Sequence, residues 1–372
     1  MSKNKIAVIF GGQSGEHLIS LRSAASIINS LDENKYEVFP VGITRDGTWI
    51  VGENVWKTLW EGNDSNNCYK TTLVTNPQEP GFLIWEERNG EKTNFSWKNI
   101  DIVFPVLHGP LGEDGTLQGL LEMAGLPYVG AGVLSSSVGM DKILMKGIFK
   151  QAGIPVCEYL HFRVDNWQKD KMYWIDKVKN SIGFPCFVKP SNLGSSVGIT
   201  KAYDKDQFVM GVEEALRYDE RILIEPFVSG QEIECSLLGD LEVKASLPGE
   251  IVPSRDFYDY HAKYIDDKSE LVIPAKLEES LVEEIQNLSI RAFKAINGSG
   301  MARVDFFVDT KKEEIVLNEI NTIPGFTSIS MYSKLWEASG IPYKRLLEEL
   351  IQISFNKFAR RQKLYNSPPA WA

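Results

Sequence analysis

The sequence predicts a protein of mixed α/β and α+β class, with a doubly wound parallel sheet in its N-terminal third. Continuous apolar runs rich in β-branched residues occupy residues 5–10, 36–43 and 100–107. Such runs, bounded by glycine and separated by helical patterns, are typical of parallel strands covered on both faces. From about residue 133 the pattern changes to helices, short strands and hairpins, and one helix is expected over residues 135–151. We therefore expect an α/β unit followed by α+β units.

The composition is that of a globular protein whose ligands are small molecules. The 372 residues include 40 Lys and Arg against 50 Asp and Glu, which gives a net charge of −10. This charge disfavours nonspecific binding to nucleic acid or membranes, and no apolar stretch reaches the roughly 18 to 20 residues of a membrane span. The four cysteines form no Cys-x-x-Cys pair. A zinc site or a disulfide framework is therefore not indicated, and a reducing cytoplasm fits best.

Two glycine-rich stretches follow strands of the predicted N-terminal sheet and mark a candidate ligand-binding edge. They are residues 11–17 and residues 108–115, and ligands bind at the carboxyl ends of the strands in such sheets. His17 and His108 lie in these turns, where each is either a substrate contact or a structural residue. Residues 52–98 have the pattern of an insertion, and no role is assigned to them.

Two predicted strands near the C-terminus carry a group of polar side chains. Arg303 and Asp305 lie two residues apart on one strand, and Glu319 and Asn321 do so on the next, so each pair points to one face. Two carboxylates and an amide are oxygen ligands of the kind that Mg²⁺ uses together with water and phosphate. The alternative is a salt bridge between Arg303 and a carboxylate.

Several lysines and glutamates fit a nucleotide site, and each also has a simpler explanation. Lys189 ends an apolar strand and precedes a Gly/Ser-rich loop at residues 191–196, which could fold over a phosphate or form a plain hairpin. The loop is not a Walker loop, because it lacks Gly-Lys-Ser/Thr and joins two strands. Lys142 and Lys146 lie on a predicted helix, where a solvated face is the usual explanation. Glu225 and Glu232 could accept hydrogen bonds from adenine and ribose.

In their order along the chain these motifs resemble those of the D-alanine:D-alanine ligases of the ATP-grasp superfamily, over essentially the whole length. The motifs are Gly11-Gly-x-Ser-x-Glu16-His17 with Ser20-Leu21, His108-Gly-x-x-Gly-Glu-Asp-Gly115, Gly139-Met-Asp-Lys142, Val188-Lys-Pro-x-x-x-Gly-Ser-Ser-Val-Gly198, Phe257-Tyr-Asp-Tyr-x-Ala-Lys263-Tyr264, Ala302-Arg-Val-Asp305 and Asn318-Glu-Ile-Asn-Thr-x-Pro-Gly-Phe-Thr-Ser328.

The resemblance implies an ATP-grasp fold and a role for each matching residue. The implied domains are an N-terminal substrate domain (1–132), a central ATP-lid domain (133–240) and a C-terminal catalytic domain (241–372) with a mobile loop at 252–270. The implied ATP-binding residues are Lys142, Lys189, Ser196, Glu225, Pro226, Val228 and Glu232. Asp305, Glu319 and Asn321 would bind two Mg²⁺ or Mn²⁺ ions. The implied catalytic residues are Glu16, Ser195, Lys263, Tyr264, Arg303 and Gly325, and the implied substrate-binding residues are His108, Tyr258, Ser330 and Met331.

The activity implied by the resemblance is ATP-dependent joining of two D-alanines through a D-alanyl phosphate, for peptidoglycan precursors in a bacterial cytoplasm, by an enzyme expected to be a homodimer. A D-alanyl-D-lactate or D-serine ligase is one alternative, because His261 stands in the lid where Asp, Glu or Asn is more usual. Another ATP-grasp carboxylate–amine ligase and a non-catalytic nucleotide-binding module are the others. A dinucleotide dehydrogenase is excluded, because the first glycine turn lacks the Gly-x-Gly-x-x-Gly spacing.

Overall fold

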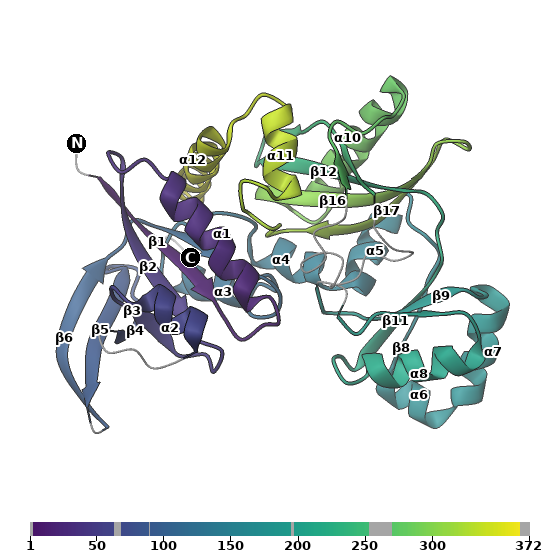
Figure 1. The fold of residues 1–372 in the computed structure, drawn as a ribbon, viewed down its shortest axis with the longest axis horizontal. Helices are drawn as coiled ribbons and strands as arrows, with labels where there is room; N and C mark the ends of the chain where they lie inside the picture. Colours follow the sequence, from purple (N-terminus) through teal and green to yellow (C-terminus); the bar gives the residue numbers. More distant parts are fainter. Residues whose placement is uncertain (1–2, 63–67, 89, 195–196, 253–269, 365–372) are drawn as a thin grey trace, which may run out of the picture.

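Three β-sheets with helices packed on their faces form the molecule (Figure 1). The computed structural model describes residues 3–62, 68–88, 90–194, 197–252 and 270–364. The first sheet belongs to the N-terminal part of the chain, and the other two lie in the part that follows residue 133.

The N-terminal sheet has a parallel centre and an antiparallel extension. Its seven strands are ordered β6-β5-β4-β3-β2-β1-β7. They are β1 (Asn4–Gly11), β2 (Tyr36–Ile43), β3 (Trp49–Val51), β4 (Tyr69–Val74), β5 (Gly81–Arg88), β6 (Glu91–Asn99) and β7 (Ile102–Val106). Strand β1 pairs in parallel with β2 and β7, as the apolar runs predict, and the other pairs are antiparallel. The insertion at residues 52–98 therefore contributes most of the extension.

Both faces of the parallel strands are covered by helices. Ile6, Val8 and Phe10 of β1 lie in a core with α1 (His17–Ser30) and α2 (Val55–Glu61). Ala7 and Ile9 point to the opposite face and pack against α3 (Thr116–Met123). Alternate side chains of a strand point to opposite faces, so a strand buried on both sides reads as a continuous apolar run.

The second sheet is a small antiparallel unit with order β10-β9-β11-β8. Its strands are β8 (Leu160–Arg163), β9 (Cys186–Pro190), β10 (Thr200–Ala202) and β11 (Arg221–Pro226). The helices α6 (Val164–Lys169), α7 (Lys171–Ser181) and α8 (Lys205–Ala215) share one apolar core with one face of this sheet. The opposite face carries Lys189 and Glu225, because both alternate with buried core residues.

The third sheet is the larger antiparallel one and has six strands. They are β12 (Gln231–Gly239), β13 (Val243–Ala245), β14 (Gly249–Val252), β15 (Glu270–Val272), β16 (Gly300–Asp309) and β17 (Glu314–Asn321). Its core face packs against α10 (Glu279–Ala295), α4 (Val133–Met140) and α5 (Lys142–Gln151).

The sheets divide the chain differently from the boundaries implied by the resemblance. Strand β12 falls in the central segment 133–240, yet it pairs with β16 along nine residues of the third sheet. Helices α4 and α5 of the same segment also contribute to the core of that sheet. We therefore propose a smaller central unit at about residues 156–226, because strand pairing and core burial tie both ends of the segment to the third sheet.

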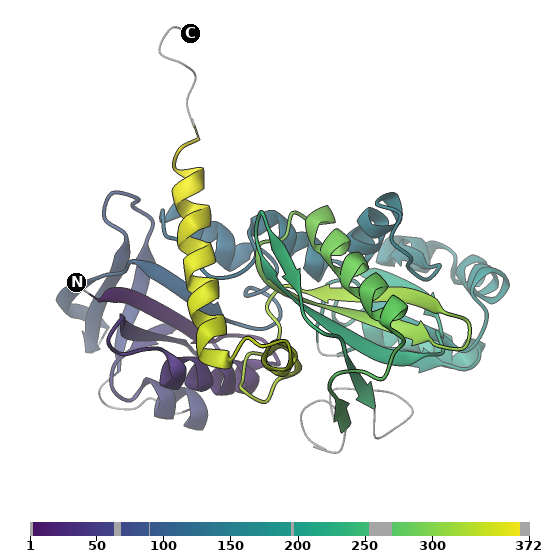
Figure 2. The ribbon, with the colours of Figure 1, turned by 90° about the horizontal axis from the view of Figure 1, so that it is seen from above.

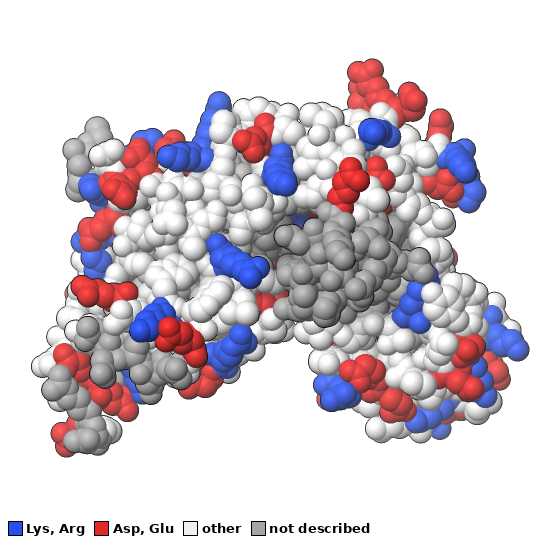
Figure 3. Space-filling model, viewed as in Figure 1, with Lys and Arg blue, Asp and Glu red and all other residues white. Residues whose placement is uncertain are grey.

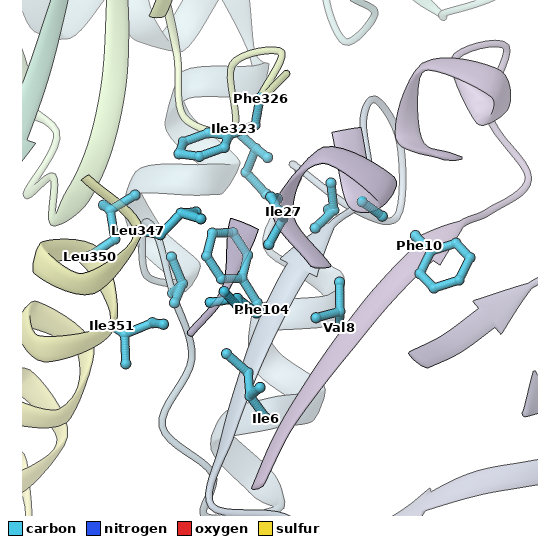
Figure 4. Close-up of a cluster of buried hydrophobic side chains, with 14 of the residues drawn as sticks. Ile6, Val8, Phe10, Ile27, Phe104, Ile323, Phe326, Leu347, Leu350 and Ile351 are labelled. Carbon is cyan, nitrogen blue, oxygen red and sulfur yellow. The ribbon is translucent and has the colours of Figure 1, made fainter. Parts of the chain in front are cut away.

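The C-terminal helices join the N-terminal sheet to the third sheet. Seen from above, α12 (Tyr343–Arg361) lies between the two sheets (Figure 2), and α11 (Met331–Ala338) precedes it. Leu347 and Leu350 of α12 pack in one cluster with Ile6 and Phe104 of the N-terminal sheet and with Phe326 (Figure 4). This shared apolar core fixes the two sheets relative to each other.

The surface carries charges of both signs. On the face drawn in Figure 3, acidic and basic side chains are interspersed over α6, α7 and α8 and over the N-terminal sheet. Within the described ranges, no helix has the length and apolar character needed to cross a membrane.

Truncation of a core residue of α12 tests the role of this helix. Leu350 is fully buried, and we expect Leu350→Ala to lower the free energy of unfolding by about 2–5 kcal/mol, because it leaves a cavity in the shared core. Urea unfolding followed by circular dichroism measures the change. Lys344→Ala, an exposed position on the same helix, is the control and should change stability by less than about 0.5 kcal/mol. Equal midpoints for the two variants would contradict the assignment.

Candidate active site

A cavity lies between the second and third sheets. Its walls come from β9 and β11 on one side and from β12, β16 and β17 on the other. Most of the predicted nucleotide and metal residues meet in it. The predicted residues in its walls are Lys142, Lys189, Glu225, Pro226, Val228, Glu232, Asp305 and Glu319.

A buried carboxylate shared by two lysines lies on the wall made by β11. Glu225 is 2.7 Å from the Nζ of Lys146 and 2.6 Å from the Nζ of Lys189. Burial alone would raise the pKa of Glu225, but the two ammonium groups outweigh it and hold the pKa far below its usual range. The solvated helix face expected for Lys142 and Lys146 is wrong, because their side chains are only 11% and 1% exposed.

The predicted helix over residues 135–151 is two helices with a break at Asp141. Asp141 has extended backbone angles, and its carboxylate accepts hydrogen bonds from the amides of Ile143 and Leu144 at the start of α5. The same carboxylate contacts Arg221 of β11 and the hydroxyl of Ser191, which follows β9. Asp141 follows the last residue of α4 and is the N-cap of α5, so its contacts also anchor the start of α5 beside the cavity.

A β-bulge directs the predicted metal ligands into the cavity. Asp305 lies opposite Glu319, but Phe306 lies opposite Leu317, so Asn318 is an extra residue on β17. Before the bulge, Ile315 and Leu317 face the apolar core. The extra residue reverses the alternation, so Glu319 shares a face with Asp305.

The side chains around the predicted metal site form hydrogen bonds and ion pairs with one another on the third sheet. Arg303 donates two hydrogen bonds of 2.7 Å to Asp305 and lies 2.8 Å from Glu234, while Asn321 donates to Asp305 at 3.0 Å. Burial disfavours the guanidinium, but Asp305 and Glu234 outweigh this and raise the pKa of Arg303 well above its usual range. The salt bridge expected as the alternative is thus present, and it involves the predicted ligand Asp305.

The oxygen donors suit a hard divalent cation. Asp305 Oδ1 accepts one hydrogen bond, so it keeps a second lone pair, and Asn321 donates through its amide nitrogen and keeps its oxygen. In the part of the chain that the structure describes, no three His, Cys, Asp or Glu side chains gather as a metal site. Two carboxylates and an amide leave most coordination positions to phosphate oxygens and water, which is the usual arrangement for Mg²⁺.

Glu234 is not among the residues predicted from the sequence, although the alternation along β12 indicates its position. Glu232, Glu234 and Ser236 alternate with Ile233 and Cys235 along β12. This period of two places the polar residues on one face, and the register puts Glu234 opposite Asp305.

A second group of predicted residues lies where the N-terminal sheet meets the cavity. A methyl group on Gly109 would stand 3.0 Å from the Glu16 carboxylate, and one on Gly194 would stand 3.3 Å from it. The turn after β7 and the loop after β9 therefore both approach Glu16. Burial and the charge of Glu16 raise the pKa of the neighbouring Glu113 well above its usual value.

The two histidines have different surroundings. His17 is fully buried, and its ring nitrogens lie 2.8 and 3.3 Å from the carbonyl oxygens of Gly12 and Leu59, so it is a structural residue. His108 lies 3.1 Å from the carbonyl oxygen of Ile323. Burial lowers the pKa of His108, so its ring is neutral near pH 7.

The loop after β17 brings the remaining described residues to the same region. A methyl group on Gly325 would stand 3.4 Å from the Ser330 hydroxyl, which in turn accepts a hydrogen bond from the Thr327 amide. Ser330 precedes α11, and Met331 begins this helix. Five predicted residues lie outside the described residues, namely Ser195, Ser196, Tyr258, Lys263 and Tyr264.

The fold and the cavity define a protein of the ATP-grasp class, in which two α+β units enclose a nucleotide. Residues 5–131 match the family described as D-ala D-ala ligase N-terminus, and residues 148–352 match D-ala D-ala ligase C-terminus. The chain therefore belongs to the D-alanine–D-alanine ligase family.

Individual relatives agree with this assignment. The D-alanine–D-alanine ligases of Natranaerobius thermophilus and Heliobacterium modesticaldum are 46% and 48% identical to the chain, over 98% of it and 97% and 98% of theirs. The solved D-alanine–D-alanine ligase of Coxiella burnetii has a TM-score of 0.82 and 38% identity, covering 98% of this chain and 97% of its own. The VanG D-Ala:D-Ser ligase of Enterococcus faecalis has a TM-score of 0.83 and 36% identity, covering 95% and 100%.

The reactivity of Cys157, which lines the cavity, tests the effect of the neighbouring charges. Burial and the neighbouring Glu225 raise the pKa of the Cys157 thiol to about 12, so at pH 8 only about one thiol in 10⁴ is a reactive thiolate. We expect iodoacetamide to label Cys157 much more slowly than Cys68, although both are partly exposed, as measured by peptide mass spectrometry. Glu225→Gln should accelerate Cys157 labelling several-fold, because Lys146 then favours the thiolate. Unchanged labelling would refute this electrostatic description.

Proposed function

We propose that the chain joins two D-alanines to D-alanyl-D-alanine at the expense of ATP, releasing ADP and phosphate. The observation that carries the proposal is the convergence of a nucleotide cavity, lined by lysines and metal-type oxygens, with the Glu16 region of the N-terminal sheet. Family membership supports the same reaction.

In the first half-reaction the carboxylate of one D-alanine attacks the γ-phosphate of ATP and forms D-alanyl phosphate and ADP. Lys142 and Lys189 would neutralise the phosphates. Glu225 and Glu232 would hold adenine and ribose, together with Pro226 and Val228 at and just after the end of β11. Glu16, with the neutral His108 beside it, would bind the ammonium group of this D-alanine. Positioning and charge neutralisation are the main contributions of a protein to phosphoryl transfer.

In the second half-reaction the amino group of the other D-alanine attacks the acyl carbon, and phosphate leaves. The tetrahedral intermediate carries an oxyanion, and Arg303 and the amide of Gly325 would donate to it. Ser330 and the amide of Met331 would hold the carboxylate of the second D-alanine. Their position at the start of α11 supports this role, because the first amides of a helix lack partners within the helix.

The divalent cation would be held by Asp305, Glu319 and Asn321. We propose two ions, Mg²⁺ or Mn²⁺, which when bound supply positive charge to the phosphates. The remaining predicted residues would close the site over the phosphates and exclude water from the acyl phosphate. These residues are Ser195, Ser196, Tyr258, Lys263 and Tyr264. We also propose that the enzyme is a homodimer in a bacterial cytoplasm, where its product supplies peptidoglycan precursors.

The decisive experiment measures Mg²⁺-dependent phosphate release from ATP and identifies the product by mass spectrometry. The reactions contain D-alanine alone, D-alanine with D-lactate or D-serine, and L-alanine as the control. Phosphate release and D-alanyl-D-alanine with D-alanine alone are expected. A mixed product dominating near neutral pH would instead assign the second site to D-lactate or D-serine, and no release in any mixture would overturn the proposal.

The ligand residues can be tested separately from the fold. We expect Asp305→Ala and Glu319→Ala each to lower turnover more than about 100-fold and to leave the circular dichroism spectrum unchanged. This loss exceeds the one typical of residues that only hydrogen-bond to a metal ligand. Glu314→Ala, an exposed carboxylate on the same strand as Glu319, should retain the turnover of the unmodified protein. Activity retained in both ligand variants would remove the metal assignment.

A further inference from the structure

Lys146 of α5 is a buried lysine that neither the motifs nor the proposed reaction employs. Its ammonium group makes three contacts: Glu225 at 2.7 Å, the carbonyl oxygen of Asn318 at 3.0 Å and the sulfur of Cys157 at 3.9 Å. An ammonium group has three donors, so this side chain is fully satisfied and its direction is fixed. A lysine this deeply buried is rare unless it is paired.

The contact with Asn318 falls at the bulge of β17. Asn318 is the extra residue that reverses the alternation of the strand, and Lys146 donates a hydrogen bond to its carbonyl oxygen. Without the reversal, Glu319 would share the face of Ile315 and Leu317, which lies in the apolar core. The hydrogen bond therefore stabilises the local backbone that directs Glu319 to the cavity.

Lys142 lies one helical turn before Lys146 and contacts Glu319, the residue that follows Asn318. Its ammonium group lies 3.4 Å from the Glu319 carboxylate and donates to the carbonyl oxygen of Leu193 at 2.8 Å. Side chains four residues apart on a helix lie on one face. Helix α5 thus contacts both the carboxylate of Glu319 and the backbone just before it.

We propose that Lys146 is a positioning residue of the divalent-cation site, which fixes the Asn318 bulge so that Glu319 points to the cation, and which holds Glu225 so that Lys189 lies beside the phosphates. The inference rests on the proposed function for its cation and nucleotide. It assigns no proton transfer and no substrate contact to Lys146.

The test compares Lys146→Met, which keeps the length of the side chain and removes its charge, with Lys150→Met. Lys150 lies one turn further along α5, in an exposed pair with Glu158. The binding of Mn²⁺ in the presence of the nonhydrolysable analogue AMP-PNP is measured by electron paramagnetic resonance, and the folded fraction by circular dichroism. We expect Lys146→Met to weaken Mn²⁺ binding about 10- to 100-fold, as is typical for residues behind a metal ligand, and Lys150→Met to change it less than about twofold.

A purely structural role predicts a different result. It would lower the melting temperature of Lys146→Met and leave the Mn²⁺ affinity of the folded protein within about twofold of the original, which would overturn the proposal. If Lys146→Met does not fold, because Glu225 is left buried without enough positive charge, the double variant Lys146→Met/Glu225→Gln is compared with Glu225→Gln alone. Weaker Mn²⁺ binding in the double variant supports the proposal, and equal binding overturns it.

This measurement does not depend on the amino acid substrate. An unmodified protein that binds Mn²⁺ with AMP-PNP but forms no dipeptide would refute the proposed function and leave the test of Lys146 intact. For an active protein, the KM for D-alanine should stay within about twofold in Lys146→Met while the Mn²⁺ requirement rises.

Discussion

Several charged groups in the walls of the cavity between the second and third sheets are largely buried, and their pairing is the constraint on which the site depends. A buried charge without a partner is costly. Glu225 forms ion pairs with two lysines, and Arg303 forms ion pairs with Asp305 and Glu234. Each group is therefore fixed in direction before a nucleotide binds, which reduces the reorganisation needed during phosphoryl transfer.

Helix α5 connects these charges to the fold. Its N-terminus is fixed by Asp141, which also contacts Arg221 of the second sheet and Ser191 just after β9. Lys142 and Lys146 reach from one face of the helix to adjacent residues of β17. A helix anchored to one sheet and bonded to the other can set the distance between the two walls of the cavity.

The N-terminal sheet contributes to the site because it shares an apolar core with the third sheet. Apolar side chains of β1, β7 and α12 form one core with Phe326, which lies in the loop after β17. Ser23 of α1 accepts a hydrogen bond from the Phe326 amide and lies 3.5 Å from His108. The region around Glu16 is thus held against the loop that carries Gly325 and Ser330 by packing and by hydrogen bonds.

The sequence by itself determined the parallel centre of the first sheet and the family. It also determined that Arg303 and Asp305 lie on one face of their strand, and that Glu319 and Asn321 lie on one face of theirs. Each of these depends on a local period or motif that neighbouring residues specify. Only the tertiary structure decided that Lys146 is buried and that β12 joins the third sheet. It also decided which face of β17 is the cavity face, because alternation from Ile315 places Glu319 in the core and one extra residue at Asn318 reverses it. A bulge and a buried ion pair both depend on partners far along the chain, so no local pattern specifies them.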